Sequence, residues 1–203
     1  MNLLKQREAV AIESEREGGR PRGISVEAAA WIGVALLSLA LRLVALDAAP
    51  LSASEAGQAT LAWRAVAGQS MPGAESYSPL LFSANALLFW LFGASDSVAR
   101  LLPALAGAAL ALTPVLMRKR LGRVGTLAAG CYLAISPTAL FASRQVDGLM
   151  IAALGAMLLV GGLIRFSESR DRRWFLLGAA GLAVTVASSP SSYGLLVGIG
   201  LAW

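Results

Sequence analysis

Apolar residues in this chain come in long runs that short polar segments separate. The first run, residues 26–46, reads VEAAAWIGVALLSLALRLVAL. At about 1.5 Å per residue a helix of this length covers about 30 Å, the thickness of the hydrocarbon core of a bilayer. It therefore predicts a membrane span. Further runs that predict spans occupy residues 97–117, 124–141, 148–166, 174–187 and 193–203, the last too short to be a complete span.

Two shorter helices are predicted in residues 47–96, the loop between the first two spans. Residues 52–68 begin at a serine, a good N-cap, and end at a glycine, a good helix stop. Residues 79–92 are apolar, but about 14 residues are too few to cross a membrane comfortably. This stretch is rich in Phe and Trp, which favour the membrane interface. We therefore expect interfacial helices in this loop.

The polar segment 1–23 mixes both signs of charge with Gly and Pro, which is typical of a flexible tail. Residues 24–203 are expected to form one transmembrane domain. Because 193–203 has only about half the length of a span, we interpret this domain as the N-terminal part of a larger, truncated one.

Composition supports an all-α, polytopic membrane protein. The chain of 203 residues is 57% hydrophobic and 14% charged, whereas soluble domains carry about a quarter charged residues. A single cysteine excludes a disulfide within one chain. The absence of histidine excludes histidine metal sites, histidine bases and Ser–His triads.

The net charge of +5 is interpreted as a topology signal rather than as a nucleic-acid footprint, because the basic residues lie at span ends. With the N-terminal tail in the cytoplasm, 13 of the 17 basic residues fall inside. Those left on or near the outside are Arg42, Arg64, Arg100 and Arg144. We expect a multi-pass protein of the cell membrane with a cytoplasmic N-terminus and no nucleic-acid partner.

Glu55 is the first candidate for chemistry. Ser52 and Glu55 fit the capping-box pattern S-x-x-E, in which the glutamate only bonds back to the serine amide. Alternatively, Glu55 is a carboxylate at the membrane surface that orients an acceptor hydroxyl or a metal ion. Gln58 lies one turn further on the same helix face. Both interpretations of Glu55 stay open.

Asp147 is the second candidate, in the short link SRQVD between two predicted spans. It either caps the following helix or acts beside Arg144, three residues earlier, at a site for phosphate. Arg42 and Arg100, near span ends, either extend to the interface or contact a lipid phosphate. Tyr77 lies in the outer loop, where a sugar could bind.

Several motifs occur together over residues 41–166: PLL in the outer loop, LFG-x-S-x-x-x-AR-LLPAL, the basic turn RKRLGR, AISP, and SR-x-x-D. In this order and spacing the chain resembles the N-terminal half of GT-C membrane glycosyltransferases. The similarity is to the protein O-mannosyltransferase and aminoarabinose transferase type, glycosyltransferase family 39-like.

The resemblance implies transfer of a sugar, with inversion, from a polyprenyl-phosphate-linked donor to an acceptor on the outer face. Glu55 matches the glutamate of the family's Asp-Glu pair, with Ser54 in place of the aspartate. Asp147 matches the acid after the third span, Arg144 its neighbouring arginine, and Tyr77 a loop position often held by His or Lys.

We therefore expect Glu55 and Asp147 to be catalytic, with a divalent cation between them as an option. The substrate-binding candidates are Arg42, Arg100, Arg144, Tyr77 and Gln58. The alternative is a non-catalytic or degenerate membrane protein that binds lipid-linked carriers or serves as a scaffold.

Overall fold

The computed structural model describes residues 25–70, 78–190 and 192–202, and all regular structure in these ranges is helical. The chain divides into two units, Met1–Ala30 and Trp31–Trp203. The packing described below is that of the second unit.

The helices follow the predicted order. They are α2 (Val26–Leu43), α3 (Ala53–Val66), α4 (Pro79–Phe92), α5 (Asp96–Leu110), the 3-10 helix η1 (Thr113–Met117), α6 (Arg118–Ile135), α7 (Pro137–Ser143), α8 (Leu149–Ser169), α9 (Arg172–Ser188) and α10 (Ser192–Ala202).

Three helical stretches in the described residues are long and apolar enough to cross a membrane: Val26–Leu43, Asp96–Ile135 and Leu149–Ser169. Their length and apolar composition suggest a membrane protein. With 17 residues, α9 is just shorter than these stretches, and α10 has 11. The number of complete crossings and the orientation stay predictions.

Two predicted spans are interrupted. The stretch 97–117 is not one helix, because α5 ends at Leu110 and η1 follows. The stretch 124–141 is broken at Ser136, since Pro137 has no amide to continue the helix and its ring clashes with the preceding turn. The predicted basic turn is also tighter than expected. Residues 118–121 are helical, and the chain turns at Gly122, whose φ of 71° suits glycine.

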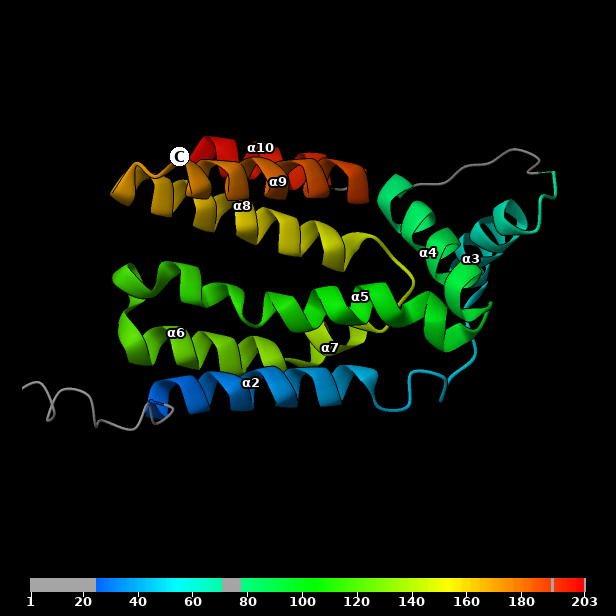
Figure 1. Cartoon of the computed structure of the whole chain (residues 1–203), viewed down its shortest axis with the longest axis horizontal. Coiled ribbons are helices and arrows are strands. Elements are labelled where there is room, and N and C mark those ends of the chain that lie inside the picture. The colour runs from blue at the N-terminus through cyan, green and yellow to red at the C-terminus, as the bar shows by residue number, and fades with distance from the viewer. Residues whose placement is uncertain (1–24, 71–77, 191, 203) are drawn as a thin grey trace, which may run out of the picture. The chain divides into compact units, whose positions relative to one another are not determined.

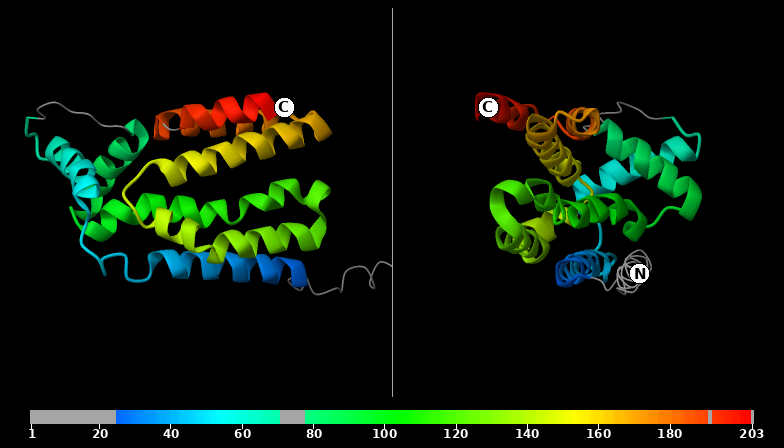
Figure 2. Two further views of the ribbon diagram at one scale, coloured as in Figure 1. Left: turned by 180° about the vertical axis from the view of Figure 1, so that it is seen from behind. Right: turned by 60° about the vertical axis from the view of Figure 1, so that its left-hand side comes forward.

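In the second unit, α5 packs on α8, and α8 packs on α9 (Figure 1). α3 and α4 pack on each other beyond one end of these helices, as both views of Figure 2 also show. Buried Ala59, Leu81, Phe89, Ala99 and Val146 join α3, α4 and α5 to the link before α8 in one apolar cluster. If α3 and α4 lie at the membrane interface, as the sequence predicts, they have to lie beyond the end of the spanning helices, as they do here.

Glycines let α8 and α9 approach closely. A Cβ atom added to Gly155 would lie 2.7 Å from the Gly181 carbonyl oxygen, and one added to Gly162 would lie 2.6 Å from the Gly178 nitrogen. Small residues at such contacts are typical of helix pairs in membranes, where close van der Waals packing drives association.

Candidate functional site

Glu55 occupies the third position of α3, and the predicted capping box is confirmed. The Ser52 amide donates to Glu55 Oε2 over 2.9 Å, and the Glu55 amide donates to Ser52 Oγ over 3.4 Å. The side chain is nevertheless buried, with 7% of its residue surface exposed. Capping is therefore only part of what this carboxylate does.

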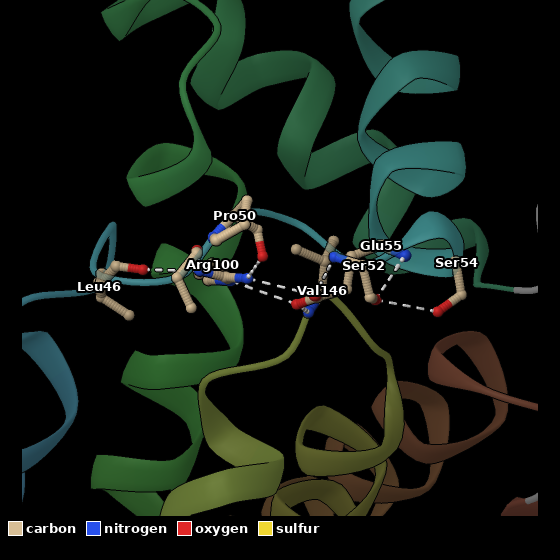
Figure 3. Close-up of polar contacts among 8 residues, drawn as sticks. Leu46, Pro50, Ser52, Ser54, Glu55, Arg100 and Val146 are labelled. Carbon is tan, nitrogen blue, oxygen red and sulfur yellow. Dashed lines mark hydrogen bonds and ion pairs between the residues drawn. The ribbon is translucent and has the colours of Figure 1, made fainter.

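Arg100 on α5 forms a buried ion pair with Glu55, with 3.2 Å between Nη2 and Oε2 (Figure 3). Its Nε also donates to Glu55 Oε1 over 3.2 Å. Nη1 donates to the carbonyls of Leu46 and Ala49, and Nη2 donates to that of Pro50. A guanidinium has five N–H groups, and all five are used here. Arg100 therefore has no donor left for a lipid phosphate.

The carboxylate of Glu55 is equally occupied. Oε1 accepts from Arg100 and from the Val146 amide at 3.0 Å, and Oε2 accepts from Arg100 and Ser52. Burial by itself would raise the pKa of Glu55. The Arg100 guanidinium and the hydrogen bonds from Ser52 and Val146 outweigh it and lower the pKa to about 2. A carboxylate of this pKa is a weak base at neutral pH.

The bond from Val146 ties Glu55 to the turn that carries Asp147. The same turn is fixed on its other side by Gly148, where an added Cβ would lie only 1.8 Å from the Ser188 carbonyl oxygen of α9. Asp147 is thus in a tightly held turn between α3 and α9. Its own side chain is exposed and makes no hydrogen bond or ion pair with the residues that the structure describes.

A cavity of about 730 Å³ lies where this turn meets α3, and both Glu55 and Asp147 line it. The structure therefore brings the two acids together, although only Asp147 has free acceptor oxygens. Gln58 also lines the cavity, as do Gln145 and Arg64.

Arg64 is the basic residue among the described residues that line the cavity, and it was not among the predicted site residues. It is partly buried, and its guanidinium makes no hydrogen bond or ion pair within the described part of the chain. Helical spacing was the available signal. Gln58, Leu61 and Arg64 follow each other at intervals of three residues, which places them along one side of α3.

Arg42 is not at the cavity. It is completely buried and donates to Ser38 Oγ at 2.7 Å, to the Leu133 carbonyl at 2.9 Å and to the Ala134 carbonyl at 3.1 Å. Because Pro137 has no amide, the Leu133 carbonyl lacks its usual helical donor, and Arg42 replaces that donor. Its role here is to cap α6.

Arg144 is also outside the cavity lining, and its Nη2 donates to the carbonyls of Val44 and Ala45. Of the predicted substrate-binding arginines, Arg42, Arg100 and Arg144, none is therefore among the described residues that line this cavity. All three bind backbone carbonyls. Tyr77 lies outside the described residues.

A metal ion between Glu55 and Asp147 does not fit this geometry, because both oxygens of Glu55 are already hydrogen-bonded. Among the described residues, no three His, Cys, Asp or Glu side chains form a cluster that could hold a metal ion.

Counting partners only among the described residues, the cavity thus offers one unpaired carboxylate, one unpaired guanidinium and two amide side chains. Amides and carboxylates suit a ligand rich in hydroxyl groups, and a guanidinium suits a phosphate. Comparisons with protein-family models, with curated proteins and with solved structures find no match for this chain.

Proposed function

We propose that the protein is a membrane glycosyltransferase that moves a sugar from a polyprenyl-phosphate donor to an acceptor hydroxyl on the outer face of the membrane. The observation that carries this proposal is the cavity lined by Asp147 and Arg64 in a protein with membrane-length helices. The family resemblance of residues 41–166 supplies the reaction class.

In the proposed reaction Asp147 accepts the proton of the acceptor hydroxyl. The acceptor oxygen forms a bond to the anomeric carbon as the bond from that carbon to the phosphate oxygen breaks. Polyprenyl phosphate leaves with the electron pair, and Arg64 stabilises its charge. Gln58 and Gln145 hydrogen-bond the sugar hydroxyls. Glu55 and Arg100 take no part in proton transfer and act as positioning residues for the Asp147 turn.

An apolar groove beside the cavity suits the lipid part of such a donor. This second cavity, of about 200 Å³, is lined by Trp63 and Phe89 and shares Ala56 and Thr60 with the first. A ligand with a polar head and an isoprenoid tail would place each part in surroundings of matching polarity.

The second candidate is a non-catalytic protein that binds lipid-linked carriers. The state of Glu55 favours it, since a carboxylate with a pKa of about 2 and four hydrogen bonds is a poor base. In this alternative the cavity holds the carrier headgroup, and no glycosidic bond is broken.

Proteoliposomes with the protein and undecaprenyl-phosphate-linked radiolabelled mannose or arabinose separate these candidates. A membrane extract supplies the acceptor hydroxyl. For an enzyme, labelled sugar is then released from the polyprenyl phosphate onto the acceptor, and Asp147→Asn slows this release at least 100-fold. Asp47→Asn is the matched control, because Asp47 is an exposed acid of the loop before α3 that does not line the cavity. Bound donor without release supports the carrier-binding alternative. If the protein neither binds nor releases label from either donor, both candidates are contradicted.

A further inference from the structure

Two polar segments outside the cavity together carry a larger net positive charge than the whole chain. Residues 118–123 and 165–173 together contain eight basic and two acidic side chains, a net charge of +6. The whole chain carries only +5. The basic residues are Arg118, Lys119, Arg120, Arg123, Arg165, Arg170, Arg172 and Arg173.

The structure joins these segments into one surface, here called the basic end. Glu168 lies 3.5 Å from Lys119 Nζ and 3.8 Å from Arg120 Nε, so one acid bridges both segments. Arg165 connects them a second time, because its Nε donates over 2.8 Å to the Leu116 carbonyl at the end of η1. Figure 1 shows the start of α6 and the α8–α9 turn at the same end of the helices, away from α3 and α4.

Aromatic rings line the basic end where α8 and α9 leave it. The Arg165 guanidinium lies 5.2 Å from the centre of the Trp174 ring, and that of Arg170 lies 5.9 Å from the Phe166 ring. Phe175 packs against Phe166 with the two rings tilted, and it is 52% exposed. Trp174 is an amphipathic aromatic residue at a helix end, and such residues are typical of the depth of lipid headgroups.

The two acids within these segments, Glu168 and Asp171, do not balance the eight basic residues of the same segments. Glu168 faces two of the basic residues, and Asp171 accepts from the Arg173 amide as the N-cap of α9. Arg170, Arg172 and Arg173 are exposed. Like charges this close repel each other, so a polyanionic partner would stabilise the arrangement.

We propose that the basic end binds the headgroups of anionic phospholipids in the adjacent leaflet. The aromatic rings and the membrane-length α8 place the charges at headgroup depth, where each Lys or Arg contributes about fivefold to affinity for an anionic surface. A soluble polyanion, such as an acidic protein, would not need these rings. This surface lies at the other end of the helices from the cavity, and the inference does not depend on the proposed function.

Native mass spectrometry of the full chain, released from micelles with equal amounts of phosphatidylglycerol and phosphatidylcholine, tests the proposal. We expect preferential retention of phosphatidylglycerol. The triple variant R170Q/R172Q/R173Q should lower that preference roughly a hundredfold, following the contribution of three charges. The matched variant R170K/R172K/R173K keeps the charge and should keep the preference.

Equal retention of the two lipids by the unchanged protein would overturn the proposal. So would an unchanged preference in the glutamine triple variant. Displacement of phosphatidylglycerol by oligoglutamate at equal charge concentration would instead identify a site for acidic proteins. The lysine variant shows whether a loss in the glutamine variant reflects charge or folding.

Discussion

Arg100 and Glu55 form a buried pair in which both side chains use all of their strong hydrogen-bonding positions, with 3.2 Å between Nη2 and Oε2. The pair joins α5, α3, the segment that precedes α3 and the turn that carries Asp147. Substitutions at this pair should therefore change stability, whereas substitutions at Asp147 and Arg64 should change ligand chemistry.

Glu55→Gln should destabilise the protein by roughly 3–5 kcal/mol, because it leaves the Arg100 guanidinium buried without a counter-charge. Asp147→Asn is the control, since that carboxylate is exposed and should change stability by less than about 0.5 kcal/mol. Denaturant unfolding in detergent measures both. A stable Glu55→Gln protein that has lost sugar transfer would instead make Glu55 the catalytic carboxylate.

Arg64→Gln should raise the KM for the polyprenyl-phosphate donor by roughly 10- to 100-fold, because a charge-assisted hydrogen bond to phosphate contributes about 1.5–3 kcal/mol. Arg64→Lys should recover part of this loss, since the charge remains without the planar fork. Initial rates against donor concentration give the values. Equal KM values in the unchanged protein and both variants would exclude a donor contact at Arg64.

Glu55 should make the free energy of unfolding decrease as the pH falls into the acid range. Its pKa is about 2 in the folded protein, against an ordinary value of 4.5. A lowered pKa means that the stabilisation is fully present above about pH 4.5 and is lost as the pH falls toward 2. The loss is on the order of 3 kcal/mol. Unfolding measured between pH 6 and 2.5 should show it in the unchanged protein and not in Glu55→Gln. Parallel pH profiles of the two would contradict the prediction.

Gly181→Val should disrupt the packing of α8 on α9, because even an added Cβ would lie 2.6 Å from the Gly155 carbonyl oxygen and from the Leu159 nitrogen. We expect a loss of about 2 kcal/mol or more, as for other overpacked contacts. Gly33→Ala is the control, since nothing lies within 4 Å of its added Cβ. Thermal unfolding in detergent compares them, and an unchanged Tm for Gly181→Val would argue against this helix contact.

Cysteine labelling tests the orientation predicted from the charges. In a Cys131→Ser background, Ser54→Cys should react with an impermeant maleimide in intact cells, and Leu121→Cys should react only after permeabilisation. Ser54 and Leu121 are both exposed, so accessibility within the protein does not limit either reaction. Labelling of position 121 but not of position 54 in intact cells would show that the true topology is the reverse of the predicted one.

The sequence predicted the positions of the helices well, because membrane-length apolar runs and capping residues are local signals. Ser52 and Glu55 are an example, since the capping box follows directly from their spacing. The break at Ser136 was also visible in principle, since Pro137 cannot continue a helix. The predicted span 124–141 instead joined α6 and α7 into one helix.

The arginines were harder to predict. Arg42, Arg100 and Arg144 were considered for phosphate because charges near a membrane are often functional. Their actual partners are backbone carbonyls, and most of these lie 50 or more residues away in the chain. No local pattern shows which carbonyls a distant helix break or loop leaves without donors. Arg64 was overlooked for the same reason, since its exposure to the cavity depends on the distant turn at Asp147.

The bond from Arg42 to the Leu133 carbonyl has a consequence for biogenesis. A nascent chain delivers α2 to the membrane about 90 residues before α6 is made. Until then the guanidinium, which lies in the last turn of α2, lacks its final acceptors and has to extend to water or lipid headgroups at the interface. The end of α2 should therefore reach its final position only after synthesis of α6.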